Sequence, residues 1–255
     1  MAVDVIPLRA FRDNYIWCLR DATHAAVVDP GDAGPVMQYL EAQHLRLVAI
    51  LATHHHADHV GGVAQLAAEY SAPVFGPARE TIPAITRRLS EGDRVRIDEF
   101  DLDFDVLDIP GHTAGHIALV GGGMLFCGDT LFSVGCGRLF EGTPAQMSVS
   151  LAKLAALPGA TRVYCGHEYT AANIRFAQAV EPANKALVRR ERETRAALES
   201  GRPSLPSTIA DEQMTNPFLR TRAPEVLASA ASHAGRMLAD PVEVFAVLRE
   251  WKNQF

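Results

Sequence analysis

Apolar and polar positions follow two different periods along the chain, and the change between them falls near residue 170. Before this point the apolar residues come in short runs bounded by Asp, Asn, Pro and Gly, which is typical of β-strands. These runs cover residues 3–6, 15–19, 25–28 and 47–51. Val36, Tyr39 and Leu40 recur at helical spacing before the last run, so the sequence predicts three strands, a helix and a buried strand.

The strand-rich pattern continues as far as residue 165. Residues 100–106 alternate between apolar side chains and three aspartates, and this favours a half-solvated strand over an acidic metal site. Apolar runs at 117–120 and 124–127 flank three glycines and predict a hairpin. The other expected elements are a strand at 73–75, an irregular connection at 76–88, a helix at 148–157 and a strand at 161–165.

After residue 170 the strand alternation disappears and helical periodicity replaces it. The expected helices cover residues 173–179, 183–200, 208–214 and 241–252. In the last of these, the stripe of Val244, Val247, Leu248 and Trp251 predicts burial, with Arg249 and Lys252 on the flanking face. We therefore expect a strand-rich catalytic domain at residues 1–170 and a smaller helical domain at residues 171–255.

Four histidines and an aspartate lie within six positions directly after the buried strand at 47–51. They are His54, His55, His56, Asp58 and His59, followed by two glycines. Histidine is the commonest metal ligand, so this density indicates a metal-binding loop. In an extended segment His54 and His56 point the same way and His55 points away. Asp58 and His59 are placed to serve a second ion; the alternative, Asp58 as a helix N-cap, explains none of the histidines.

Three further candidate ligands also follow predicted strands. His112 lies in a Gly-flanked segment, Asp129 follows a run whose burial requires a cation for its carboxylate, and His167 ends the strand-rich region. His116 is either a neighbour of the ligands or a core histidine. The apolar, Gly-rich stretch at 131–142 is expected to line the pocket.

The candidate ligands are therefore seven: His54, His56, Asp58, His59, His112, Asp129 and His167. Seven are too many for one tetrahedral zinc ion but suit two divalent ions that share a carboxylate. Zinc is expected in both sites, with iron or manganese as the alternative at the second. The four cysteines lack C-x-x-C spacing, so we expect free thiols, and a thiolate ligand is the less favoured alternative.

Composition and charge restrict the partners. The formal net charge is −6, divided into −8 for residues 1–170 and +2 for residues 171–255, and it argues against nucleic acid. The Arg/Glu run at 189–195 has the mixed signs of a solvated helix face. The sequence has neither a membrane-length apolar run nor a signal-like N-terminus, so we expect a cytoplasmic protein that does not bind membranes. We also expect a monomer.

Several motifs together resemble the metallo-β-lactamase superfamily and, within it, the hydroxyacylglutathione hydrolase (glyoxalase II) family. The superfamily motif H-x-H-x-D-H stands at His54–His59. The narrower resemblance extends over nearly the whole chain. Its motifs lie at residues 13–17, 53–62, 111–116, 128–132, 135–138, 166–170 and 216–220, and at Arg249, Lys252 and Phe255.

The resemblance implies a four-layer αββα sandwich followed by the helical domain. It assigns His54, His56 and His112 to the first metal, Asp58, His59 and His167 to the second, and Asp129 to both. It also implies that the substrate contacts Arg138, Tyr169, Arg249 and Lys252. At Phe140 some relatives have a tyrosine that bonds glutathione, so this hydrogen bond is not expected here.

The implied reaction is hydrolysis of an S-(2-hydroxyacyl)glutathione such as S-D-lactoylglutathione, which is the second step of methylglyoxal detoxification. Two metals sharing a water lower its pKa and give a hydroxide nucleophile, which Asp58 is expected to orient. A thiol of pKa near ~8.5 leaves as its thiolate without a general acid, so a thioester suits this site better than an amide.

Three other functions are compatible with parts of the pattern. Another hydrolase of the superfamily, such as a lactonase or β-lactamase, would not require the cationic C-terminal segment. A persulfide dioxygenase, an oxidoreductase with one iron, lacks a helical extension of this length. A metal-stabilised binding module is disfavoured because structural zinc sites are closed at four ligands.

Overall fold

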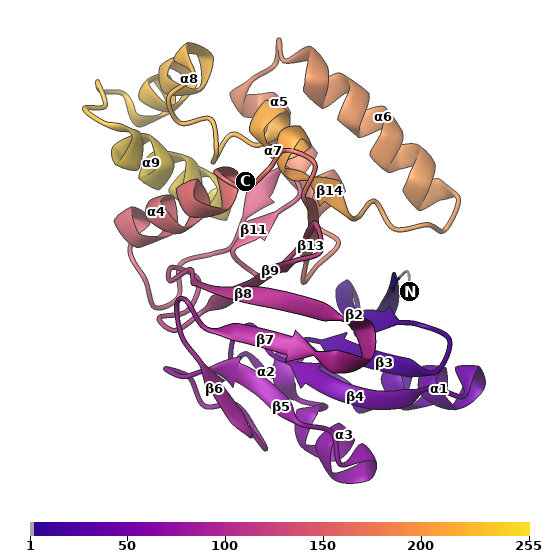
Figure 1. The fold of residues 1–255 in the computed structure, drawn as a ribbon. Helices are drawn as coiled ribbons and strands as arrows, with labels where there is room; N and C mark the ends of the chain where they lie inside the picture. The colour runs from indigo at the N-terminus through magenta and orange to yellow at the C-terminus, as the bar shows by residue number, and fades with distance from the viewer. Residues whose placement is uncertain (1–2) are drawn as a thin grey trace. The chain divides into compact units, whose positions relative to one another are not determined.

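The computed structural model describes residues 3–255, and this part of the chain forms two compact units (Figure 1). The first unit comprises the described residues up to Asp108 together with Thr113–Gly128. The second comprises Ile109–His112 and Asp129–Phe255. The expected division into domains at residues 1–170 and 171–255 remains a prediction.

A six-stranded sheet forms the base of the first unit. Its strands, in spatial order, are β1 (Asp4–Ala10), β2 (Asn14–Arg20), β3 (His24–Val28), β4 (Arg46–Leu51), β5 (Val74–Pro77) and β6 (Arg87–Leu89). The first three are antiparallel, whereas β3 to β6 are parallel. Parallel neighbours need crossover connections, and the chain supplies α1 (Ala33–Gln43), then α2 (Ala57–Val60) with α3 (Val63–Tyr70).

Helices α1 and α3 close one face of this sheet. Val36 and Leu40 of α1 and Leu66 of α3 pack with Val27 and Ile50 in one buried cluster. The expected helical stripe of α1 is thus confirmed, and so is the helical pattern after the two glycines of the histidine loop. The histidine loop directly follows the carboxyl end of β4 and leads into α2.

A second group of strands in the first unit is antiparallel throughout. It contains β7 (Arg94–Ile97), β8 (Leu102–Asp108), β9 (Ile117–Gly121) and β10 (Met124–Gly128), with a 3-10 turn at Asp98–Phe100. On β8, Phe104 and Val106 are fully buried, whereas Asp105 is exposed and pairs with Arg94 at 3.1 Å. The alternating acidic strand is therefore half-solvated, as the sequence indicated.

The second unit is mainly helical. Its strands are β11 (Leu131–Phe132), β12 (Gly135–Cys136), β13 (Arg162–Cys165) and β14 (Ser207–Thr208), and its helices are α4 (Pro144–Ala155), α5 (Thr170–Val180), α6 (Lys185–Glu199), α7 (Ile209–Thr215), α8 (Pro224–Ala234) and α9 (Pro241–Gln254). β11 and β12 form a hairpin, and β13 pairs antiparallel with β14. None of the described helices combines the length and apolar content needed to cross a membrane.

Some element boundaries differ from those expected. α4 begins at Pro144 rather than at residue 148, because Thr143 and Gln146 form a capping box before the apolar stripe starts. α8 was not expected: only Val226 and Ala230 are buried along its Ala/Ser-rich length, so its periodicity is weak. On α9 the buried side chains include Phe245 and Arg249, so the buried face extends beyond the expected stripe and includes part of the flanking face.

Gly128, the last residue of β10, offers a test of how the strand end is built. Its φ is +45°, and a Cβ there would overlap Thr53 Oγ1 and lie 2.8 Å from His116 Cε1. Gly128→Ala should therefore lower the free energy of unfolding by about 2–4 kcal/mol, measured by guanidinium denaturation. Gly123→Ala is the matched control, since Gly123 also has positive φ, +72°, but open space around it. Gly123→Ala should lower the free energy of unfolding by about 1 kcal/mol. An equal decrease in Gly128→Ala and Gly123→Ala would rule out close packing around Gly128 as the cause.

Candidate functional site

The histidine loop is anchored where it leaves β4 by a carboxylate from the end of β3. Thr53 donates to Asp29 twice, from its backbone N and from Oγ1, both at 2.7 Å. The same carboxylate lies 3.2 Å from His59 Nδ1. All three residues are buried. Asp29 therefore positions the loop, although its oxygens also group with nitrogens of His54 and His59.

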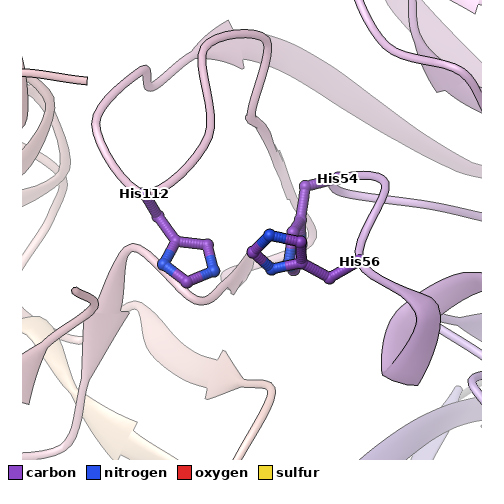
Figure 2. A group of neighbouring side chains, drawn as sticks. All are labelled: His54, His56 and His112. Carbon is purple, nitrogen blue, oxygen red and sulfur yellow. The ribbon is translucent and has the colours of Figure 1, made fainter. Parts of the chain in front are cut away.

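His54 and His56 turn their imidazoles toward each other. His54 Nε2 lies 3.2 Å from His56 Nδ1, and Figure 2 shows both rings leaving one loop, drawn with His112 of the second unit. His55 instead directs Nδ1 to Glu80 Oε2 at 3.0 Å. The alternation expected from the extended backbone is confirmed. Zinc–nitrogen bonds of about 2.0–2.1 Å at a tetrahedral angle separate two ligand nitrogens by roughly 3.3 Å, so this spacing fits a shared ion.

Asp58 and His59 lie inside the short helix α2. The helix is capped by His56 without a side-chain hydrogen bond, so the N-cap alternative for Asp58 does not apply. Asn14 Nδ2 donates to Asp58 Oδ2 at 3.0 Å, and the same oxygen lies 3.7 Å from His59 Nε2. The arrangement directs a carboxylate oxygen and an imidazole nitrogen to one place, which suits a second cation.

In the second unit, one oxygen of Asp129 faces two imidazoles. Asp129 Oδ2 lies 3.2 Å from His167 Nε2 and 3.6 Å from His112 Nε2, and all three residues are buried. His112 Nδ1 faces the backbone oxygen of Arg138 at 2.8 Å. This contact leaves Nε2 as the nitrogen on the Asp129 side. A carboxylate oxygen close to two imidazole nitrogens is a donor set that suits a divalent cation.

His116 is a neighbour of the histidine loop. Its ring is stacked on that of His54, with centroids 4.5 Å apart, and Nδ1 lies 3.0 Å from the oxygen of Ile117. It is fully buried. Its position therefore suits support of His54 rather than direct binding of an ion.

A pocket of about 460 Å³ opens beside Asp129 in the second unit. It is lined by His112, Asp129, Phe132, Cys136, Arg138, Phe140, Tyr169, Ala172, Asn173, Arg249 and Lys252. The expected substrate contacts Arg138, Tyr169, Arg249 and Lys252 are all among them. The stretch at 131–142 also lines this pocket, as its apolar, Gly-rich composition indicated.

The two C-terminal cations of the pocket have different environments. Arg249 is buried on α9, where Nη1 donates to the oxygen of Cys136 at 2.7 Å and the guanidinium lies over Phe218. Lys252 is half-buried, with Nζ over the ring of Phe176. Burial, together with the charge of Arg249, lowers the pKa of Lys252 to about 8. Arg249 therefore braces the pocket wall, and Lys252 is the more available cation.

The four cysteines all lie within the described residues, where they are buried and form no disulfide bond. Burial raises the pKa of the Cys18 thiol to about 12 and also raises the pKa values of Cys136 and Cys165. Protonated thiols are poor metal ligands, so the expectation of free thiols stands and the thiolate alternative loses ground.

Three residues with roles at the site were not identified from the sequence. Asp29 lies in an Asp-Pro-Gly segment, and this local pattern indicates only a turn. Asn14 was part of a motif without an assigned role. Glu80, in the connection after β5, is buried and accepts hydrogen bonds from Thr113 Oγ1 and the backbone N of Gly115 as well as facing His55. Only contacts between distant segments reveal these roles.

Two family models divide the chain between them. The model of the metallo-beta-lactamase superfamily matches residues 10–167, and that of the hydroxyacylglutathione hydrolase C-terminus matches residues 168–255. The fold class expected from the sequence, a mixed α/β metallo-β-lactamase fold followed by a helical C-terminal part, is thereby confirmed.

Similar proteins include full-length relatives and solved structures. The hydroxyacylglutathione hydrolase of Nitrosomonas eutropha is 53% identical, covering 99% of both chains, and that of Alkalilimnicola ehrlichii is 56% identical, covering 98% of this chain and 99% of the relative. The crystal structure of ETHE1 from Myxococcus xanthus matches with a TM-score of 0.68 and 25% identity, covering 98% of this chain and 91% of that one. The crystal structure of TTHA1623 in a di-iron-bound form matches with a TM-score of 0.58 and 28% identity, covering 84% of this chain and 100% of that one.

Because the superfamily model covers more than half of the sequence and relatives at 53% identity extend over its full length, the chain belongs to the metallo-beta-lactamase superfamily and, within it, to the hydroxyacylglutathione hydrolase family.

Proposed function

We propose that this protein hydrolyses S-(2-hydroxyacyl)glutathione thioesters, such as S-D-lactoylglutathione, to glutathione and a 2-hydroxy acid. One observation carries the proposal. A single pocket is lined both by the candidate metal ligands His112 and Asp129 and by the cations Arg138, Arg249 and Lys252. Glutathione has carboxylates at both ends, so its thioester suits a pocket with cations beside a hydrolytic centre. The relatives' activity supports the same substrate.

We infer two divalent ions per chain, with Asp129 bridging them. His54, His56 and His112 would hold the first ion, and Asp58, His59 and His167 the second. The distances within each unit and the nitrogen and oxygen donors support this assignment. Zinc is proposed for both sites. The second has more oxygen donors, so iron or manganese would also suit it, and the di-iron form of TTHA1623 supports this alternative.

The chain's own residues would prepare the reaction by positioning the attacking water. When bound, the ions would supply a water of lowered pKa and polarise the thioester carbonyl. Asp58, held by Asn14, would orient the attacking water through its carboxylate. The leaving thiolate needs no proton donor, because its conjugate thiol has a pKa near ~8.5.

Substrate contacts are proposed for the pocket wall. Tyr169 stacks flat on His167, with ring centroids 4.7 Å apart, so its position is coupled to that candidate ligand. Phe140 lies edge-on to His112 and is 63% exposed. Because phenylalanine has no hydroxyl, this side chain would contact the substrate only through its ring.

We also propose that the protein is a cytoplasmic monomer whose partner is this small thioester, with no nucleic acid or membrane involved. The negative net charge supports the exclusion of nucleic acid. The lack of a spanning helix among the described residues is compatible with the proposed independence from membranes.

The first test separates hydrolysis from oxidation. With S-D-lactoylglutathione the purified protein should release one thiol per thioester, followed with a thiol reagent, while an oxygen electrode records no uptake. Glutathione persulfide should likewise cause no oxygen uptake. Oxygen consumption with the persulfide, without thioester cleavage, would transfer the assignment to a persulfide dioxygenase.

The second test concerns the bridging role. Asp129→Ala should lose both ions in elemental analysis, from about two per chain, and lose activity by at least about 100-fold, because one carboxylate serves both sites. Asp105→Ala, which removes an exposed carboxylate of β8, is the control and should retain both ions and full activity. Retention of both ions in Asp129→Ala would contradict the bridging assignment.

The third test uses the pKa of Lys252. This pKa, about 8, is lower than usual, so the ammonium is present below pH 8 and lost above it. If it binds a glutathione carboxylate, KM should rise about fivefold between pH 7 and pH 9 with kcat changed little. Lys252→Arg keeps its charge over this range and should show a flatter KM profile. Identical profiles in the two proteins would exclude Lys252 from substrate binding.

A further inference from the structure

The hairpin formed by β11 and β12 is held almost entirely by side chains from the helical region. Asn173 Nδ2 donates to the oxygen of Ser133 at 2.9 Å. Asn216 Nδ2 lies 3.2 Å from the oxygen of Phe132 and 2.9 Å from that of Gly135. The hairpin turns within two residues, so few of its backbone groups can pair with each other. Its shape therefore depends on these external partners.

Val134, at the second position of this turn, has a strained backbone. Its φ is +58°, a region that favours glycine or asparagine and that a β-branched residue rarely adopts. Its side chain is fully buried, packed with Ile174, Ala177 and Leu187. Backbone strain of this kind persists only where the surroundings enforce it, and it occurs most often at functional sites.

Glu212 is the group that enforces this conformation. The backbone N of Val134 donates to Glu212 Oε2 at 2.7 Å, and Asn216 Nδ2 donates to the same oxygen at 3.0 Å. Glu212 is completely buried on α7, and Ser207 also hydrogen-bonds to its carboxyl group. Removing a carboxyl group from water is costly, so its presence here indicates a role for the hydrogen bonds that it accepts.

The position of the β11–β12 hairpin explains why Glu212 is buried there, because the hairpin connects two parts of the pocket. Asp129 lies two residues before β11, Phe132 contacts the rings of His167 and Tyr169, and Cys136 accepts the hydrogen bond of Arg249. Phe132 and Cys136 both line the pocket. A change in the turn at Val134 would move both of these pocket residues.

We propose that Glu212, with Asn216 one turn later on α7, forms a clamp that positions the β11–β12 hairpin for substrate binding. Glu212 does not line the pocket, so it is a positioning residue and not a catalytic one. The clamp gives a role to Asn216, the first residue of the motif at residues 216–220. The proposal rests on the proposed function, because the pocket that the clamp shapes is the proposed glutathione site.

The chemistry of Glu212 defines the variants. Burial raises the pKa of its carboxyl group, so an uncharged side chain is well tolerated at this position. Glu212→Gln retains an oxygen that accepts from Val134 and Asn216. Glu212→Met has a similar size but no strong acceptor, so it removes the clamp while filling the same volume. Replacing a buried carboxyl by an apolar side chain is often tolerated by the fold.

The experiment measures KM and kcat for S-D-lactoylglutathione, together with metal content. Glu212→Met should raise KM about fivefold with kcat within about twofold and the metal content unchanged, because the metal ligands keep their own contacts. Glu212→Gln should restore KM to within about twofold of the wild type. A purely structural role would lower thermal stability without this division between KM and kcat.

Glu181 supplies the matched control. It is a buried carboxylate of the same unit, paired with Arg220 at 2.9 Å, and it is absent from the pocket wall. Glu181→Met should lower stability and leave KM unchanged. A KM increase in Glu181→Met equal to that in Glu212→Met would overturn the clamp, because general loosening would then explain both.

Two further measurements decide the remaining outcomes. If Glu212→Met does not fold, Glu212→Asp replaces it, since the shorter side chain withdraws the acceptor from Val134; an unchanged KM overturns the clamp and a raised KM supports it. Lys252→Ala is assayed in parallel. An unchanged KM in Glu212→Met overturns the clamp. If Lys252→Ala raises KM, the proposed glutathione site stands and only the clamp is wrong. If neither variant changes KM, the proposed glutathione site is wrong as well.

Discussion

The structure depends most on how its buried imidazoles are held by oxygen atoms. A neutral imidazole has one donor and one acceptor nitrogen, and in a buried ring each needs a partner. His54, His59 and His112 all direct Nδ1 to an oxygen, at 3.1, 3.2 and 2.8 Å, from Thr53, Asp29 and Arg138 respectively. Each contact fixes the orientation of the ring, so that Nε2 is the nitrogen that would coordinate a metal. Thr53 follows β4, Asp29 follows β3 and Arg138 follows β12, so the positions of these three candidate ligands depend on the strands that precede the oxygens.

The same requirement explains how much of the site the sequence could predict. His54 and His56 converge because an extended backbone alternates its side chains, and that rule needs no tertiary information. The roles of Asp29 and Glu80 depend on contacts with residues 24 to 35 positions away, which no local pattern encodes. The burial of Arg249 has a similar cause. Helical spacing places it beside the apolar stripe, and the distant oxygen of Cys136 makes its burial possible.

The fold shows the same division between local and distant information. The helices expected at 183–200 and 241–252 agree with α6 and α9 to within two residues at each end. Short edge strands such as β6 and β7, with arginines at alternate or adjacent positions, carried too weak a pattern to be expected. The β11–β12 hairpin is the extreme case. Its turn has a valine, Val134, at a position of positive φ where glycine is usual. The turn forms because Glu212 and Asn216 supply hydrogen bonds that the local sequence cannot provide.

The cationic end of the pocket and the end at His112 and Asp129 should affect different kinetic constants. Arg138, Arg249 and Lys252 line one pocket, and their mutual repulsion contributes to the lowered pKa of Lys252. This repulsion is already present in the folded protein, so a ligand that brings carboxylates relieves it on binding. The relief is equal in the ground state and the transition state, because the carboxylates of glutathione lie away from the scissile bond. The cationic end should therefore set KM, and the end at His112 and Asp129 should set kcat. The β11–β12 hairpin begins two residues after Asp129 and contains no candidate metal ligand, so its displacement would disturb substrate binding without removing one.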